Sequence, residues 1–262
     1  MPDKISIDWR SRRVAIETAW VGSADAAAPV MVFLHEGLGS VAQWKNFPDT
    51  LCRHLGMRGL LYSRPGYGAS TPRAPDEHWG VDFMHQQALE VLPAVLAHYG
   101  ITAPWLYGHS DGGSIALLFA AHFPQVPAGI VVAAPHILVE EISVTSIAAA
   151  RHAYLHQGLR ARLARYHQDV DSAFFGWCDA WLSPAFRSWS IESVLDQIRC
   201  PLLAIQGEED EYGSLQQVWG IRARAPQAEV QQFATCGHAP HISQPQQNIA
   251  AVAAFVAAHL TA

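Results

Sequence analysis

Ser110 lies at the centre of the pentapeptide 108–112, which reads Gly-His-Ser-Asp-Gly. This G-x-S-x-G pattern follows an apolar run at 103–107 and precedes a helix-like stretch at 113–121. A strand, a tight turn and a helix in this order expose a serine hydroxyl above a sheet, and the glycines let neighbouring backbone approach without a Cβ clash. An ordinary strand-to-helix connection can share the pattern, so Ser110 is a candidate nucleophile whose partners must be sought.

A serine nucleophile needs a histidine as base, and the histidine needs a carboxylate that fixes its tautomer. With this motif the acid and then the histidine are expected downstream. The short apolar run 201–206 opens into an acidic turn that holds Glu208, Glu209, Asp210 and Glu211. Such a turn is often only a solvated loop, but its position at a strand end favours Asp210 as the acid.

The base is sought in the loop that follows the strand-like run 229–233. His238 comes directly after a glycine in this loop, and His241 competes with it three residues later. Most of the 14 histidines must be surface or core residues. The order of the motifs favours His238 as the base.

Together these motifs resemble the α/β-hydrolase superfamily, in the branch of small cap-bearing esterases and carbon–carbon bond hydrolases. The resemblance extends from about residue 14 to the C-terminus. The segment 35–39 (HEGLG) resembles the H-G-x-type oxyanion loop, and 63–70 (SRPGYGAS) resembles the D-x-R-G-x-G-x-S segment. This family resemblance implies an α/β fold with a mostly parallel central sheet flanked by helices and a helical cap inserted after the sixth strand.

The resemblance also implies an oxyanion hole formed by the backbone N–H groups of Gly37 and Asp111. Two departures from the family pattern stand out: Glu36 replaces a second glycine, and Ser63 replaces the aspartate of the arginine segment. We expect the side chains of Asp111 and Glu36 to point away into polar contacts. If either faced the pocket, its charge would oppose the oxyanion unless a substrate ammonium neutralised it, which would favour α-amino esters.

Composition agrees with one enzyme domain of 262 residues, 50% of them hydrophobic and 15% charged. The net charge of −6 and the lack of a Lys/Arg run argue against nucleic-acid binding. The apolar runs are too short to span a bilayer, and the N-terminus lacks a signal-peptide core, so we expect a cytoplasmic protein with no membrane partner. Oligomeric state has no sequence signal here.

The cysteines show neither C-x-x-C pairs nor metal-ligand spacing. We expect reduced, buried thiols, with no metal and no cofactor. These cysteines are Cys52, Cys178, Cys200 and Cys236.

Apolar runs alternate with helical patterns along the chain, which predicts a sheet covered on both faces. The segments 5–9 and 14–21 are expected to form an antiparallel pair. Further strands are predicted near 30–34, 58–62, 103–107, 129–134, 201–206 and 229–233, and helices near 41–55, 83–98, 113–122, 214–224 and 245–259. No strand is predicted between 134 and 201, which gives a core of 1–135 and 199–262 with a cap at 136–198.

The cap segment is rich in aromatic residues: Phe174, Phe175, Trp177, Trp181, Phe186 and Trp189. Phe174, Trp177 and Trp181 share one helical face. This stripe either attaches the cap to the core or covers the acyl pocket, and both can hold for different rings. The candidate pocket residues are Glu36, His109, His136, Trp177, Trp181 and His241.

These features predict a metal-independent serine hydrolase that cleaves small-molecule carboxylic esters, or related activated acyl bonds, through an acyl-enzyme. A carbon–carbon bond hydrolase or an enol-lactone hydrolase could use the same residues. The same fold and residues also occur in small-ligand receptors with slow turnover and in cofactor-free oxygenases or haloperoxidases. Turnover of a simple aryl ester separates enzyme from receptor, and oxygen uptake identifies the oxygenase.

Overall fold

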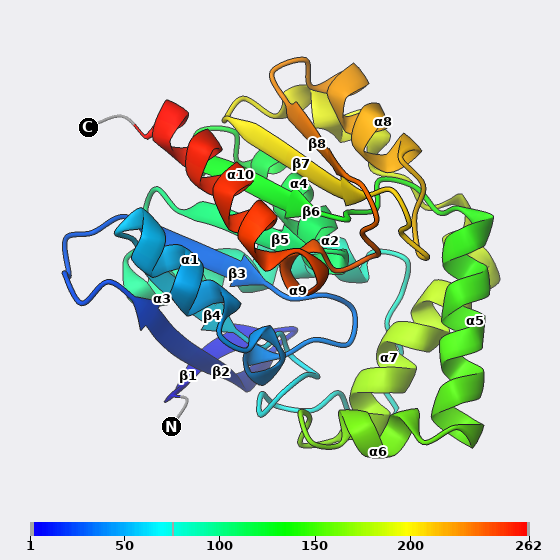
Figure 1. The fold of residues 1–262 in the computed structure, drawn as a ribbon. Helices are drawn as coiled ribbons and strands as arrows, with labels where there is room; N and C mark the ends of the chain where they lie inside the picture. The colour runs from blue at the N-terminus through cyan, green and yellow to red at the C-terminus, as the bar shows by residue number, and fades with distance from the viewer. Residues whose placement is uncertain (1–2, 75, 261–262) are drawn as a thin grey trace.

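The computed structural model describes residues 3–74 and 76–260, and within them eight strands form one central sheet (Figure 1). The strand order is β1-β2-β4-β3-β5-β6-β7-β8. β2 pairs antiparallel with β1, as predicted, and also with β4, and all other pairs are parallel, in agreement with the mostly parallel sheet that was expected. The strands are β1 (Asp3–Trp9), β2 (Arg12–Gly22), β3 (Val30–Leu34), β4 (Arg58–Tyr62), β5 (Trp105–His109), β6 (Gly129–Ala133), β7 (Leu202–Gly207) and β8 (Glu229–Phe233).

Helices cover both faces of the sheet, with α1 and α10 on one face and α3, α4 and α8 on the other (Figure 1). The helical elements are η1 (Val41–Trp44), α1 (Phe47–Leu55), α2 (Phe83–Gln86), η2 (Gln87–Val91), α3 (Leu92–Tyr99), α4 (Asp111–His122), α5 (Glu141–His156), α6 (Leu159–Leu163), α7 (Val170–Leu182), η3 (Pro184–Ser188), η4 (Glu192–Gln197), α8 (Gln216–Arg224), α9 (Pro240–Ser243) and α10 (Pro245–His259).

The central strands β3 to β7 are mainly apolar because each face of the sheet has its own core. Along β3, Met31 and Phe33 pack in the core under α1 and α10, whereas Val32 and Leu34 pack in the core that holds α4. This alternation follows from the two-residue period of a strand. Burial on both faces explains why the central strands show no polar alternation in sequence.

Two helices differ from the predicted ones. The segment predicted at 41–55 is interrupted because Lys45 has a left-handed φ of 53°, which ends η1 before α1 begins. The segment predicted at 83–98 contains the π-helical turn η2 directly before α3. Pro93, near the start of α3, has no N–H for the carbonyl four residues earlier, and a π turn accommodates such a missing bond.

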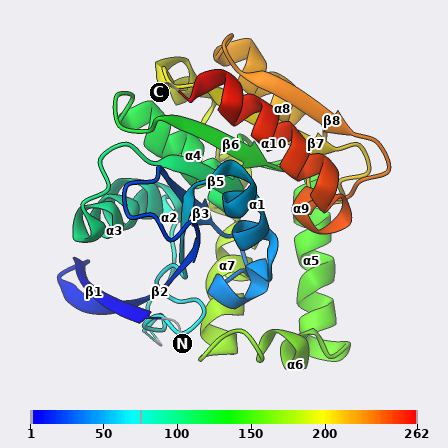
Figure 2. The ribbon, with the colours of Figure 1, turned by 60° about the vertical axis from the view of Figure 1, so that its left-hand side comes forward.

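Helices α5, α6 and α7 follow the sixth strand and stand beyond the carboxyl ends of the parallel strands (Figures 1 and 2). An isolated bridge between Leu138 and Ser190 joins the two ends of this segment. The helical insertion after β6 is as predicted, while its division from the core at 136–198 stays a prediction. Over the described residues, no helix combines the length and apolarity needed to cross a bilayer.

Candidate active site

Ser110 occupies a sharp turn between β5 and α4. Its φ of 53° and ψ of −121° lie outside the ordinary regions for a residue with a side chain. Such strain costs about 1–3 kcal/mol and persists only where the surroundings enforce it. Two glycines permit this turn, because a Cβ on Gly112 would overlap the carbonyl oxygen of Leu34 and one on Gly108 would overlap the backbone of Gly112.

Three side chains from separate loops form a continuous chain of hydrogen bonds. The Ser110 Oγ lies 2.9 Å from His238 Nε2, and His238 Nδ1 lies 2.9 and 3.0 Å from the two carboxylate oxygens of Asp210. The carboxylate can only accept, so Nδ1 carries the proton and Nε2 is free to accept the serine hydroxyl. This tautomer is the one that a histidine base needs to activate a serine.

Asp210 is held as a carboxylate by several donors. Its Oδ1 accepts the backbone N–H groups of Tyr212 and Gly213, at 2.8 and 3.2 Å, and its Oδ2 accepts the side-chain amide of Gln206 at 2.5 Å. Burial alone would raise the pKa of Asp210, but the hydrogen bond and charge of His238 and the Tyr212 N–H outweigh it and lower the pKa. These contacts hold Asp210 in its ionised form.

Of the three glutamates beside Asp210, two are exposed to solvent and one contacts the His238 backbone. The side chains of Glu208 and Glu209 are exposed. Glu211 contributes one oxygen, which accepts the backbone N–H of His238 at 3.1 Å. The structure thus places one carboxylate of the cluster on the imidazole of His238 and another on its backbone.

The loop after β3 is fixed by contacts to one carbonyl group. The carbonyl oxygen of Glu36 accepts from His35 Nδ1 at 2.7 Å and from Arg64 Nη2 at 2.8 Å. The backbone N–H of Arg64 donates to His35 Nε2 at 3.0 Å, which leaves the proton on Nδ1. Burial lowers the pKa of His35 well below its usual value, so this histidine stays neutral.

The fixed carbonyl of Glu36 sets the direction of the next N–H group. A trans peptide is planar, so the N–H of Gly37 points opposite to that carbonyl. Asp111 is the first residue of α4, and its N–H has no acceptor within the helix. Neither N–H has a hydrogen-bond acceptor among the described residues, and both residues line the same cavity as Ser110. Two unpaired N–H groups beside a nucleophile can receive an oxyanion.

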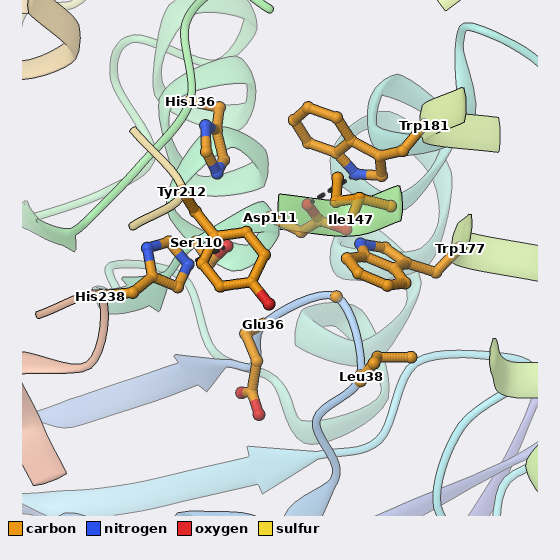
Figure 3. A pocket seen from close by; sticks show the side chains of 11 residues that line it. Glu36, Leu38, Ser110, Asp111, His136, Ile147, Trp177, Trp181, Tyr212 and His238 are labelled. Carbon is orange, nitrogen blue, oxygen red and sulfur yellow. Dashed lines mark hydrogen bonds between the residues drawn. The ribbon is translucent and has the colours of Figure 1, made fainter. Parts of the chain in front are cut away.

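A cavity of about 120 Å³ opens over Ser110 between the strand ends and helices α5 and α7 (Figure 3). Its walls combine apolar side chains with a few polar groups near the serine. The lining residues are Glu36, Gly37, Leu38, Ser110, Asp111, His136, Ile147, Trp177, Trp181, Tyr212 and His238. Four of the six candidate pocket residues from the sequence lie in this wall: Glu36, His136, Trp177 and Trp181.

The remaining two, His109 and His241, lie behind His238 and do not line the cavity. The Nε2 of His109 donates to the carbonyl oxygen of His238 at 2.8 Å, which directs the ring away from the cavity. The ring of His241 packs against Trp44 and Phe47, with centroids 5.0 and 5.3 Å apart. His109 thus supports the loop of His238, and the ring of His241 packs against that of His109 with centroids 4.7 Å apart.

The aromatic stripe on α7 divides between two roles. Trp177 and Trp181 line the cavity, and Trp177 packs so closely on Gly37 that a Cβ there would overlap the indole ring. Phe174 instead stacks on Tyr154 of α5, with ring centroids 3.7 Å apart. One face of the helix therefore both covers the cavity and holds α5 to α7.

Three wall residues were missed by reasoning from sequence: Leu38, Ile147 and Tyr212. Tyr212 lies two residues after Asp210, and its ring packs 4.7 Å from that of His238. Because Tyr212 lies in the same turn as the acid, the sequence could have predicted that it lines the cavity. Nothing in the local sequence separates Ile147 from the other apolar residues of α5.

The side chains of Asp111 and Glu36 were both expected to point away from the pocket. The Glu36 carboxylate does turn away from Ser110 (Figure 3). Its Oε2 lies 3.7 Å from His109 Nδ1. Asp111 differs, because its carboxylate lies in the cavity wall, where Oδ1 accepts from Trp181 Nε1 at 3.2 Å (Figure 3). The first turn of α4 points this side chain towards α7, and the indole of α7 holds it there.

Ser63, the second departure from the family pattern, forms a hydrogen bond with a carboxylate on β2. The hydroxyl of Ser63 donates to the carboxylate of Glu17 at 2.6 Å, and the same oxygen accepts the N–H of Ala69 at 2.9 Å. The backbone N–H of Val41 donates to Ser63 Oγ at 2.9 Å. Glu17 on β2 thus brings a carboxylate to the segment in which Ser63 replaces the usual aspartate.

The cysteines and the possible metal ligands all lie in the part of the chain that the structure describes. The four cysteines are buried and unpaired. Within residues 3–74 and 76–260, no three His, Cys, Asp or Glu side chains are grouped so that they could hold a metal ion.

Comparison with known proteins agrees with this architecture. A family model described as "Alpha/beta hydrolase family" matches residues 31–252. An sn-1-specific diacylglycerol lipase of Mus musculus is 24% identical over 89% of this chain and 82% of its own length. A 2-hydroxy-6-oxononadienedioate/2-hydroxy-6-oxononatrienedioate hydrolase of Comamonas testosteroni is 23% identical over 79% of this chain and 80% of its own.

Solved structures show the same fold. A putative aryl esterase from Burkholderia cenocepacia superimposes with a TM-score of 0.74 at 22% identity, covering 98% of this chain and 99% of its own. A thermophilic esterase from Thermogutta terrifontis gives a TM-score of 0.74 at 18% identity, with full coverage of both chains.

Proposed function

Because this chain belongs to the alpha/beta hydrolase family, we propose that it is a serine hydrolase that cleaves carboxylic esters of small molecules through an acyl-enzyme. One observation carries the proposal. Ser110, His238 and Asp210 are joined by hydrogen bonds, and Ser110 lines a cavity together with Gly37 and Asp111, whose N–H groups are unpaired among the described residues. Esterase and lipase relatives support the same reaction class.

In this mechanism Ser110 Oγ attacks the ester carbonyl carbon while its proton moves to His238 Nε2. The tetrahedral oxyanion accepts hydrogen bonds from the N–H groups of Gly37 and Asp111, each worth about 3 kcal/mol of barrier. The carbon–oxygen bond to the alcohol then breaks, and the alcohol leaves with the proton from His238. Asp210 stabilises the imidazolium and keeps its orientation throughout.

Water completes the cycle by the same steps. His238 takes a proton from a water molecule, whose oxygen attacks the acyl carbon of the ester on Ser110. The bond to Ser110 Oγ breaks, the serine regains its proton from His238, and the carboxylic acid is released. No step needs a redox partner, since hydrolysis consumes only water.

A carbon–carbon bond hydrolase is the second candidate, because the Comamonas hydrolase aligns over most of this chain. The same serine and histidine would then act on a vinylogous diketone. A panel of p-nitrophenyl esters of increasing acyl length, run beside an aromatic-acid ester and such a diketone, separates the two. Faster turnover of the diketone would replace the esterase proposal.

The proposal is tested with the variant S110A and the matched control S188A, which alters an exposed serine on η3. The wild type and S188A should turn over p-nitrophenyl butyrate many times and bind one fluorophosphonate per chain. S110A should do neither, because both reactions need the same activated hydroxyl. Full labelling of S110A, or a single turnover by the wild type, would overturn the proposal.

A further inference from the structure

The Asp111 carboxylate is a buried acid with one of its two oxygens unused. The residue is 1% exposed. Oδ1 accepts from Trp181 Nε1, while Oδ2 has no hydrogen-bond partner among the described residues. Buried polar atoms are nearly always paired, so an unpaired carboxylate oxygen in a cavity wall points to a missing donor.

No basic group of the described chain supplies that donor. Arg64 attracts Asp111 at longer range but forms no ion pair with it among residues 3–74 and 76–260. Burial raises the pKa of Asp111 to about 6, although the charge of Arg64 and the bond from Trp181 act in the opposite direction. At neutral pH Asp111 is therefore ionised, and no cation among the described residues pairs directly with its carboxylate.

The position of this charge makes it costly for the proposed reaction. Asp111 follows Ser110 directly, and its own N–H is one of the two proposed oxyanion donors. A negative side chain near a developing oxyanion raises the barrier by Coulomb repulsion, which is strong in a site that excludes water. A substrate that brings a positive charge removes this penalty and can donate a hydrogen bond to Oδ2.

We propose that the preferred substrates are esters of amino acids, whose ammonium group beside the scissile carbonyl donates to Asp111 Oδ2. The inference rests on the proposed ester hydrolysis and names its substrate class. An ammonium is favoured over a hydroxyl because a hydroxyl would satisfy the oxygen but leave the charge in place.

The charged and titratable groups around Asp111 are compatible with a bound cation. Burial lowers the pKa of His136 to about 3, so this wall residue stays neutral and does not compete for the carboxylate. The Glu36 carboxylate faces His109. The remaining charged or titratable neighbours are Arg64, Tyr67 and His238. Arg64 holds the loop after β3 through its backbone and side chain, and the hydroxyl of Tyr67 is neutral.

The test compares three ethyl esters with the same four-carbon acyl chain: L-2-aminobutanoate, L-2-hydroxybutanoate and butanoate. For the wild type at pH 7, kcat/KM for the amino ester should exceed that for butanoate by about 10- to 100-fold, the size expected for a hydrogen bond to a charged group. In D111N, kcat/KM should fall for the amino ester and rise for butanoate. These opposite changes distinguish charge recognition from a loss of structure, which would lower both.

A matched control removes a different charge from the same region. Asp179 lies on α7 and is exposed, with its carboxylate 3.3 Å from Arg151. D179N should leave the ratio of amino ester to butanoate at the wild-type value. In the wild type the ratio should also fall below about pH 6, where Asp111 takes up a proton, and above about pH 8, where the substrate amine loses one.

Several results would overturn the inference. Equal wild-type kcat/KM values for the amino ester and butanoate would show that no ammonium is recognised, and a hydroxy ester as good as the amino ester would assign a hydroxyl instead. Hydrolysis of p-nitrophenyl butyrate without hydrolysis of the amino ester would refute the substrate class while leaving the proposed function standing. Failure of every ester would refute both.

Discussion

The Nη2 of Arg64 donates to the carbonyl oxygen of Glu36 across 2.8 Å and thereby fixes the direction of the following N–H group. Arg64 is 1% exposed, and its guanidinium carbon lies over the Tyr67 ring, 4.8 Å from the centroid, which holds the side chain in place. This side chain does not line the cavity. It acts as a positioning residue for the N–H of Gly37.

We therefore expect R64M to lower kcat for p-nitrophenyl butyrate by about 10- to 100-fold while KM changes little, because an oxyanion donor acts mainly in the transition state. Steady-state kinetics and the rate of fluorophosphonate labelling check this. R58M is the control, since Arg58 lies on β4 with its guanidinium 4.1 Å from the Trp20 ring and takes no part in these contacts. A rise in KM at constant kcat would assign Arg64 to substrate binding instead.

The acidic turn predicts graded effects of substitution. D210N should lower kcat by about 10⁴-fold, as expected when the histidine loses its carboxylate. E208Q and E209Q should stay within about twofold, because both side chains are exposed. E211Q keeps an acceptor for the His238 N–H and should be mild, whereas E211A should cost about tenfold. An E208Q variant as inactive as D210N would contradict the assignment of the acid.

The pair formed by Glu17 and Ser63 predicts a compensated substitution. E17A should lower the free energy of unfolding by about 2–3 kcal/mol, because the Ser63 hydroxyl and the Ala69 N–H lose a buried acceptor. S63D alone should also destabilise, by placing two carboxylates together. The double variant E17A/S63D should be more stable than the sum of the single losses predicts. Additive losses in urea denaturation would show that the two positions are independent.

The raised pKa of Asp111 predicts how stability depends on pH. Its folded value of about 6 lies above the ordinary value of 3.8, so the folded protein binds more protons than the unfolded chain between these pH values. Stability is therefore lost as pH rises through this window. D111N removes the effect, and its stability relative to the wild type should increase by about 2 kcal/mol between pH 4 and pH 7. A difference that stays constant with pH would contradict the burial of an ionisable carboxyl.

The positions of the strands along the chain and of the turn at Ser110 were predictable because they depend on local patterns. Apolar runs of five or six residues marked the buried strands, and the glycines of 108–112 marked a turn that only small residues permit. The break near Lys45 and the π turn before Pro93 were not predicted, because both are short backbone irregularities inside otherwise helical patterns.

The sequence by itself determined the fold and the serine, acid and histidine that the fold brings within hydrogen-bond distance, since motif order along the chain dictates which strand ends carry them. Only the tertiary structure decided which polar groups face the cavity. His109 and His241 turn behind His238, while Asp111, expected to point away, faces the cavity beneath Trp181. Side-chain direction at His109 and Asp111 depends on partners that are 129 and 70 residues away in the chain, and no local sequence pattern encodes such contacts.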